Sequence, residues 1–484
     1  MLLALAGCGP RAVAPTRPLT IAHFSAPQSL DPHRHDEALT HSILGHFYDG
    51  LTGFDGEARI RPALAQSWEN PDDLTWRFHI RPGVVFHDGR PLEAADVVAS
   101  LERARSLQQG MAAGYLVEVA QVRALDPHTV EIVTRRPYPI LLNKLAFVAI
   151  VPRDAPVKIE RPIGTGPYQF VSYQSGVGMD LEAFPRRWRA PDIEPRVRML
   201  FVPDSAERLA KLLSGEADVA TDLSVADVAR VNEAPCCTVR SRSGLGVAYL
   251  QLRTSQHPFD DLRVRRAISL ALDREALVRR VLGGQGSPAG QMVPPQVFGY
   301  APDISPPARD LAQARQLLAA AGFKDGLDLE IEFRPGPDLS ELQTELAEAG
   351  IRCRLVPRPW SELYPRLLAG QVTGYYGGWQ CPTGDASDLL DQKVHSKGAE
   401  GYGASNFNGY SNPRLDRLIE QSAATLDMTE RRRTLESAMH VLSDDLGLIP
   451  LMVMANVYGV RRDLEWQPRS DHRVCAWEMR RRGS

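Results

Sequence analysis

The chain has 484 residues, 43% of them hydrophobic and 24% charged, which is the composition of an ordinary globular protein. Its 56 Lys and Arg residues nearly balance its 59 Asp and Glu residues, and the net charge of -3 excludes an overall field that would attract nucleic acid or an anionic membrane. Because a single core rarely grows to this length, we expect two or three domains.

The amino end has the features of an exported lipoprotein. Leu5, Ala6, Gly7 and Cys8 resemble a bacterial lipobox, in which small residues before the cysteine admit a signal peptidase. A diacylglyceryl group on Cys8 would anchor the mature protein to a bacterial membrane. We expect residues 1–18 to be a truncated lipoprotein signal and a proline-rich tether, with the assigned start inside the signal peptide. The mature protein would then be periplasmic or at the cell surface.

The first elements after the tether are a strand, a loop and a helix. Residues 19–22 predict a short strand, and the loop that follows it carries Phe24 and Ser25. A helix is expected over residues 38–51, with Tyr48 near its end. The loop between strand and helix is therefore the first candidate for a ligand-facing segment.

A half-buried strand comes next. Trp76, Phe78 and Ile80 alternate with polar residues, which is the period-two pattern of a strand with one buried face. Residues 84–86 predict a second short strand after a Pro-Gly turn.

An amphipathic helix is predicted over residues 92–105. Ala95, Val98 and Leu101 recur at helical spacing and are expected to face the core. On its own, this α+β region contains no pattern of catalytic or metal-binding residues.

Residues 163–170 contain two closely spaced glycines, Gly164 and Gly166. Glycine permits a positive φ and close backbone approach, which suits a strand at the rim of a cleft. The segment is not a phosphate loop, because no Lys-Ser or Lys-Thr pair follows the glycines.

The second half alternates helices and strands, as in an α/β fold. A strand is expected over residues 247–252, followed by a helix that begins at Asp260 or Asp261. Val264, Ala267, Ile268 and Ala271 form the apolar stripe of that helix. Further helices are expected over residues 310–321, 339–349 and 360–368, and residues 410–419 are expected to open another helix pair. Further strands are expected over residues 327–333, 353–356 and 449–453.

Several segments carry a resemblance to a known family. They are residues 61–68 (RPALAQSW), 74–89 (LTWRFHIRPGVVFHDG), 92–100 (LEAADVVAS), 258–277 and 410–419. The first three resemble, nearly residue for residue, the large extracytoplasmic solute-binding proteins that serve peptide-type ABC importers, the dipeptide, oligopeptide and nickel-binding family.

The resemblance implies a mixed α/β, two-lobed fold of the periplasmic-binding-protein type, with a two-strand hinge and an additional subdomain in the first lobe. We expect residues 19–246 plus 455–484 to form lobe 1, with the inserted subdomain at about residues 57–155. Residues 247–454 would form lobe 2.

The resemblance also implies where a ligand binds. Phe24, Ser25 and Tyr48 would line the cleft from lobe 1. Arg334 matches the arginine that receives the peptide carboxylate in dipeptide-binding members, a task that suits a planar guanidinium. A surface arginine beside a loop remains the alternative.

The loop after Trp379 is the second implied ligand contact. Trp379 is expected to be a stacking wall, with core packing as the alternative. Peptide-binding members hold the ligand's amino group with an aspartate where this chain has Pro382, so an unmodified peptide is not the expected ligand unless Asp385 replaces that clamp. Cys381, in the same loop, is also a predicted ligand-binding residue.

The function that follows from the resemblance is the substrate-binding component of an ABC importer. It would capture a small, peptide-like or related solute by closing its lobes and deliver it to permease subunits, as a monomer without cofactor, metal or nucleic acid. One alternative is a ligand sensor or peptide chaperone that docks on a receptor. Another is a hydrolase, although no nucleophile elbow, zinc motif or Walker loop is present.

Three groups of residues remain. The histidines near the first loop suggest a metal-chelate ligand or, by preference, solvated side chains: His33, His35, His41 and His46. The cysteines after Cys8 allow one disulfide at unspecified positions: Cys236, Cys237, Cys353, Cys381 and Cys475. The arginine clusters at residues 186–187, 431–433 and 480–482 are predicted to be solvated surface.

Overall fold

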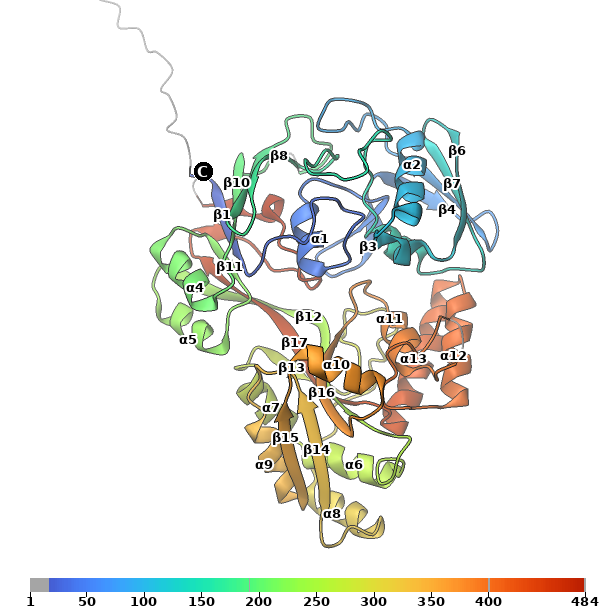
Figure 1. Cartoon of the computed structure of the whole chain (residues 1–484), viewed down its shortest axis with the longest axis vertical. Coiled ribbons are helices and arrows are strands. Elements are labelled where there is room, and N and C mark those ends of the chain that lie inside the picture. Colours follow the sequence, from blue (N-terminus) through green and yellow to red (C-terminus); the bar gives the residue numbers. More distant parts are fainter. Residues whose placement is uncertain (1–16, 191, 399–400, 483–484) are drawn as a thin grey trace, which may run out of the picture.

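The computed structural model describes residues 17–190, 192–398 and 401–482. Figure 1 shows two lobes, one above the other, with two long strands passing between them. The mixed α/β, two-lobed fold predicted from the sequence is therefore confirmed. Cys8 and most of the predicted tether lie outside the described residues.

The main sheet has eleven strands and extends through both lobes. Strands β12 (Cys237–Leu252) and β17 (Ile449–Arg461) pair antiparallel at its centre. In the first lobe β17 pairs with β11, and the sheet continues through β11 (Val219–Thr221), β1 (Leu19–His23), β10 (Arg196–Phe201), β9 (Gly178–Ala183) and β8 (Tyr168–Gln174). In the second lobe β12 pairs with β16, and the sheet continues through β16 (Gly374–Gln380), β14 (Leu327–Phe333) and β15 (Ile351–Pro357), while β13 (Gly286–Pro288) pairs with β17.

The first lobe contains a subdomain with its own sheet and core. The strand order of this sheet is β4 (Ala65–Glu69), β5 (Thr75–Ile80), β7 (Thr129–Thr134) and β6 (Val119–Asp126). Helix α2 (Ala94–Ser106), the short helix η1 (Ala112–Leu116) and α3 (Leu141–Leu145) accompany it. Trp76, Phe78 and Ile80 are buried, so the period-two prediction for this strand is confirmed.

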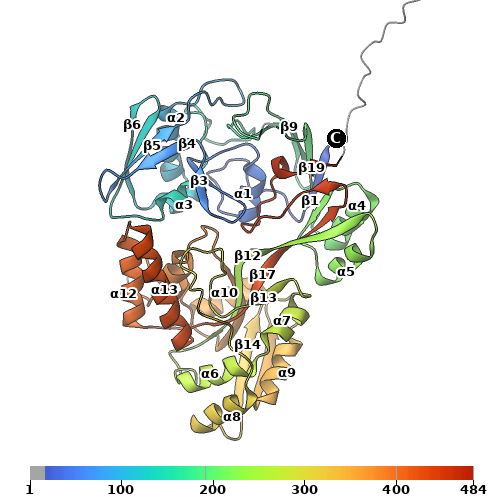
Figure 2. The ribbon, with the colours of Figure 1, turned by 180° about the vertical axis from the view of Figure 1, so that it is seen from behind.

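The remaining first-lobe elements are short. They are α1 (Ala38–Leu44), the pair β2 (Thr52–Phe54) and β3 (Ile60–Pro62), α4 (Ser205–Ser214), α5 (Val225–Glu233), the pair β18 (Leu464–Glu465) and β19 (Arg480–Arg481), and η3 (Ala476–Glu478). Helix α1 ends seven residues before the predicted end at residue 51, and Tyr48 lies after it. The final segment of the chain, from residue 464, returns to the first lobe beside β1 and α1 (Figure 2).

The second lobe packs helices on both faces of its part of the sheet. Along β12, alternate residues face opposite cores: Tyr249 joins one apolar cluster and Leu250 the other. The helices are α6 (Leu262–Ala271), α7 (Arg274–Val281), α8 (Leu311–Ala320), α9 (Ser340–Glu348), α10 (Trp360–Leu368), α11 (Ser387–Leu389), the π-helical turn η2 (Leu390–Val394), α12 (Pro413–Ala424) and α13 (Met428–Asp445). The predicted stripe of α6 is confirmed, because all four residues are buried.

Two sequence predictions in the subdomain are wrong. Residues 84–86 do not form a strand; Val85 makes an isolated bridge to Pro91. The buried face of α2 contains Ala94, Val97 and Leu101, whereas the sequence predicted Ala95, Val98 and Leu101. Two of the three predicted positions are therefore wrong by one residue. Which face of the helix is buried is set by its packing on distant segments, and helical spacing alone does not specify that face.

Gly164 and Gly166 allow a close backbone contact. A Cβ atom on Gly164 would lie 2.1 Å from the carbonyl oxygen of Phe47, and one on Gly166 would lie 2.5 Å from that of His46. The Gly166 N–H donates to Phe47 O at 2.8 Å. The predicted close approach is confirmed, but neither residue has a positive φ.

Two further observations concern membranes and disulfides. Among the residues that the structure describes, no helix combines the length and the apolar character needed to cross a bilayer. The cysteines from Cys236 onward are all free thiols. The disulfide that the sequence allowed among them is therefore not formed.

Candidate functional site between the lobes

A cavity of about 620 Å³ lies between the two lobes. The first lobe contributes two tryptophans of the subdomain, Trp68 and Trp76, and the second lobe contributes Phe298, Met428 and Arg432. The Arg432 guanidinium lies 4.4 Å from the ring centre of Phe298. The cavity therefore offers aromatic walls with a cation at one side, a combination that suits an apolar ligand with a few polar groups.

Polar contacts join the lobes near this cavity. The side-chain amide of Asn143 donates to the Thr383 carbonyl at 2.8 Å, and Lys144 Nζ lies 3.3 Å from Asp388 Oδ1. Both views of the ribbon show the subdomain facing α12 and α13, away from the point where β12 and β17 enter the first lobe beside α4 and α5 (Figures 1 and 2). The lobes thus have a continuous two-strand link on one side and a contact made of side chains on the other.

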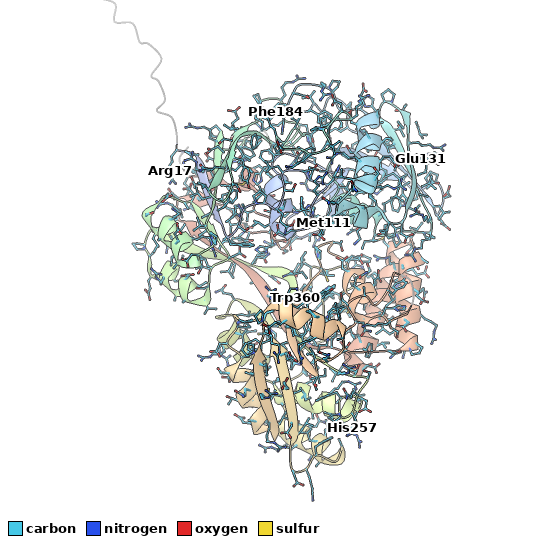
Figure 3. The ribbon with its side chains drawn as sticks, in the orientation of Figure 1. Arg17, Met111, Glu131, Phe184, His257 and Trp360 are labelled. Atoms are coloured by element: carbon cyan, nitrogen blue, oxygen red, sulfur yellow. The ribbon has the colours of Figure 1, made fainter. Side chains whose placement is uncertain are left out.

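Arg334 follows β14 and is exposed. Its guanidinium carbon lies 5.7 Å from the Trp360 ring centre, and Trp360 lies 5.1 Å from the ring of Tyr364. Figure 3 shows Trp360 on the side of the second lobe that faces the first, with Met111 across from it on the first lobe. Trp360, Tyr364 and Met111 are each at least 41% exposed, so these apolar surfaces are accessible to a ligand.

Trp379 belongs to an aromatic cage around a buried ammonium group. Lys393 Nζ lies 5.0 to 5.6 Å from the ring centres of Tyr249, Trp379 and Phe407. Among the described residues, Lys393 Nζ makes one hydrogen bond, at 3.4 Å to the carbonyl of Ser405, and has no carboxylate within 4 Å. Burial lowers the pKa of Lys393 from its ordinary value of 10.5 to about 7, although the three aromatic faces oppose this shift by favouring the cation.

Lys393 was not predicted from the sequence. A lysine in a short helical segment is ordinarily a solvated side chain, and nothing in its neighbours along the chain indicates three rings around it. The signal is tertiary, because the rings come from β12, β16 and the loop before α12.

Asp385 and Cys381 lie inside the second lobe. Asp385 borders the interlobe cavity, but Arg431 donates to both of its carboxylate oxygens, at 2.6 and 2.9 Å. This pairing leaves Asp385 unable to serve as the free clamp for a ligand ammonium that the sequence suggested. Cys381 is 1% exposed, and burial raises the pKa of its thiol.

The predicted first-lobe residues do not form one group. Phe24 and Ser25 follow β1 and are exposed, and Phe24 keeps 37% of its surface accessible. Tyr48 is 5% exposed and donates to the Leu30 carbonyl at 3.4 Å. Phe24 and Ser25 are therefore accessible to a ligand in this structure, whereas Tyr48 is enclosed in the first lobe.

The expectation of solvated histidines is wrong for most of the cluster. His33, His35 and His46 are buried, with exposures of 1% or less. His33 is held by the Ala149 carbonyl at 2.9 Å and accepts a hydrogen bond from Arg103 at 2.8 Å. Within the described ranges, no group of three or more His, Cys, Asp and Glu side chains has the arrangement of a metal site.

Two lobes that share a pair of strands, with aromatic and cationic side chains between them, define a binding protein whose site forms at the lobe interface. The model for "Bacterial extracellular solute-binding proteins, family 5 Middle" matches residues 59–401, more than half of the chain. The chain belongs to this family.

Relatives and solved structures agree with this assignment. The chain is 28% identical to heme-binding protein A of Haemophilus influenzae, covering 84% of this chain and 81% of the relative. It is also 28% identical to the dipeptide-binding protein of Escherichia coli K12, covering 89% and 88%.

Three solved structures share the fold. HbpA2 of Haemophilus parasuis superposes with a TM-score of 0.86 at 24% identity, covering 96% of this chain and all of the other. The unliganded open form of the murein tripeptide binding protein MppA gives 0.83 at 20% identity, covering 97% and 98%. DppA of Helicobacter pylori in complex with the peptide STSA gives 0.75 at 23% identity, covering 96% and 98%.

Proposed function

We propose that this protein captures a small solute between its lobes outside the cytoplasm and delivers it to the permease of an ABC importer. The observation that carries the proposal is the interlobe cavity, which both lobes line. Closure requires a ligand that binds the closed form of the protein more tightly than the open form. If the difference in binding free energy is about 1.4 kcal/mol, the ratio of closed to open protein rises about tenfold. The solute leaves chemically unchanged.

The hinge of this movement is proposed to lie where the pairing of β12 with β17 is interrupted. Ser243 pairs with Ala455 and Gly246 pairs with Met454, so two residues of β12 are out of register between them. A bulge of this kind allows a strand to bend. This position supports the predicted division of the chain. Lobe 1 would comprise residues 19–246 plus 455–484, and lobe 2 would comprise residues 247–454.

Beyond the lining of the interlobe cavity, which contains none of these residues, the ligand is proposed to contact Arg334, Trp360 and Trp379 on the second lobe and Phe24 and Ser25 on the first. Heme-binding and dipeptide-binding relatives suggest an organic solute. Pro382 supplies no charge for a free amino terminus, and Asp385 is already paired with Arg431. A solute without a free ammonium therefore fits this site better than an unmodified peptide.

Attachment to a membrane is proposed to occur through a lipid on Cys8, supported by the residues that precede it. Metabolic labelling of expressing bacteria with a radioactive fatty acid tests this directly. Label in the wild type and none in Cys8→Ala is expected, and equal label in both would refute the anchor.

The transport role is tested with the purified protein. Native mass spectrometry should detect a co-purifying compound, and small-angle X-ray scattering should show a smaller radius of gyration when that compound is added back to the stripped protein. Recovery of the compound with unchanged mass is expected. An unchanged radius of gyration at saturating compound, or its conversion to a product, would contradict the proposal.

A further inference from the structure

A second cavity, of about 80 Å³, lies within the first lobe. It is bordered by α1, β2 and the final segment of the chain, and its lining includes His35, His41, Arg61, Arg189 and Arg473. This volume exceeds the space needed for a single water molecule and suits a small charged group. The lining is strongly basic, so its charge balance decides what the cavity can hold.

Two of the arginines around this cavity are neutralised by carboxylates. Arg189 donates to Asp49 Oδ1 from both Nε and a terminal nitrogen, at 3.0 and 2.7 Å. Arg469 binds Asp471 and Glu478, each at 2.7 Å. Asp49 balances Arg189, whereas Arg469 faces two carboxylates, so these two arginines are accompanied by three carboxylates.

Among the described residues, the guanidinium groups of Arg61 and Arg473 make no hydrogen bond to a carboxylate. Arg61 Nε donates to the Phe54 carbonyl at 2.9 Å, and its terminal nitrogens have no hydrogen-bond partner among the described residues. The carboxylate closest to Arg473 is that of Asp471, 3.9 Å from Nε, which is beyond hydrogen-bonding distance. Burial lowers the pKa of both side chains, yet guanidinium groups stay charged in proteins. Two cations with incomplete partners therefore line one small cavity.

His35 supplies an independent indication of a ligand. It is 1% exposed, and neither ring nitrogen has a hydrogen-bond partner within the described residues. Its ring centre lies 4.4 Å from that of His41, whose Nε2 is 3.3 Å from the Tyr115 hydroxyl. A buried polar side chain without a partner is costly, and an occupant that accepts its N–H would relieve that cost.

The first-lobe cavity adjoins the face that looks toward the second lobe. Arg473 lies 5.3 Å from the Phe147 ring, and Tyr115 stacks on the same ring at 5.1 Å. Tyr115 belongs to η1, which begins directly after Met111, the residue that Figure 3 places on the facing surface of this lobe. The inference requires that a ligand held between the lobes extend one group into this cavity.

We infer that the first-lobe cavity binds an oxyanion, a carboxylate or a phosphate group, through Arg61, Arg473 and His35. A guanidinium donates two parallel hydrogen bonds to such a group, and a neutral imidazole adds a third donor. The inference rests on the proposed function, because the oxyanion is part of the transported solute. It narrows the ligand to acidic molecules.

Isothermal titration calorimetry on the purified protein tests the inference with three probes at matched ionic strength: inorganic phosphate, succinate and uncharged glycerol. Saturable binding of at least one anion and none of glycerol is expected, and the stronger anion identifies the oxyanion. Arg473→Gln should weaken that binding at least tenfold. Arg279→Gln, at an exposed position on α7, should leave it unchanged.

Arg61→Gln is a second variant that decides the outcome if Arg473→Gln does not fold. Saturable binding of neither anion, or wild-type affinity in the folded variants, overturns the inference. The scattering experiment with the co-purifying compound separates this failure from that of the transport role. If that compound still closes the lobes, only the oxyanion site is refuted.

Discussion

Arg431 of α13 forms a bidentate ion pair with Asp385 in the interior of the second lobe. The distances are 2.6 and 2.9 Å, and neither residue is more than 2% exposed. Burial by itself would raise the pKa of Asp385, but the adjacent guanidinium outweighs it and holds the pKa below the ordinary value of 3.8. The Ser387 hydroxyl also donates to this carboxylate, at 2.8 Å.

Asp385→Asn is expected to destabilise the protein by about 3 to 5 kcal/mol, because it leaves the Arg431 charge buried without a counterion. Urea unfolding at pH 7 measures the loss. Since the folded-state pKa is depressed, the wild-type contribution is present above pH 3.8 and is lost as the pH falls through the folded value. The control is Asp444→Asn, at an exposed position on α13, the helix that carries Arg431. It should change the free energy of unfolding by less than about 0.5 kcal/mol. Equal effects of the two substitutions would contradict the assignment.

Lys393→Met is expected to stabilise the protein at pH 7 by roughly 1 to 3 kcal/mol, because it removes the cost of burying an ammonium group that has no carboxylate partner within the described ranges. The folded-state pKa of about 7 lies below the ordinary 10.5, so folding releases a proton between these values and wild-type stability rises across that range. The advantage of the variant should therefore shrink from pH 7 to pH 10. Chemical unfolding at several pH values measures it, and an advantage independent of pH would be evidence against the burial cost.

Gly166→Ala is expected to destabilise the protein by about 1 to 3 kcal/mol or more. A Cβ atom there would lie 2.5 Å from the His46 carbonyl oxygen, so the backbone after α1 must shift. Gly114→Ala is the control, since a Cβ atom at that position meets nothing within 4 Å. Thermal unfolding of both variants tests the contact, and similar midpoints would show that the close approach is easily relaxed.

Arg334→Ala is expected to weaken binding of an acidic solute by roughly 1.5 to 3 kcal/mol, the usual value of a hydrogen bond to a charged group. Its exposure predicts little change in stability. Calorimetry with the co-purifying compound gives the affinity, and Arg280→Ala, at another exposed arginine of the second lobe, serves as the comparison. An unchanged affinity would remove Arg334 from the site.

The local pattern of the sequence determined much of the second lobe. The predicted bounds 327–333 and 360–368 coincide with β14 and α10, and the apolar stripe of α6 is the predicted one. These features depend on periodicity and on capping residues such as Asp261, which act within a few residues along the chain. The segments that resemble the family likewise predicted the two-lobed fold.

Tertiary structure alone decided the character of individual polar residues. The predicted solvated arginine Arg431 is buried because Asp385, 46 residues away along the chain, lies beside it. Lys393 acquired its aromatic cage, and His35 its enclosure, from segments that no local pattern connects with them. Burial and charge pairing are set by which distant segments pack together, so the periodicity that specifies a helix or strand carries no information about them.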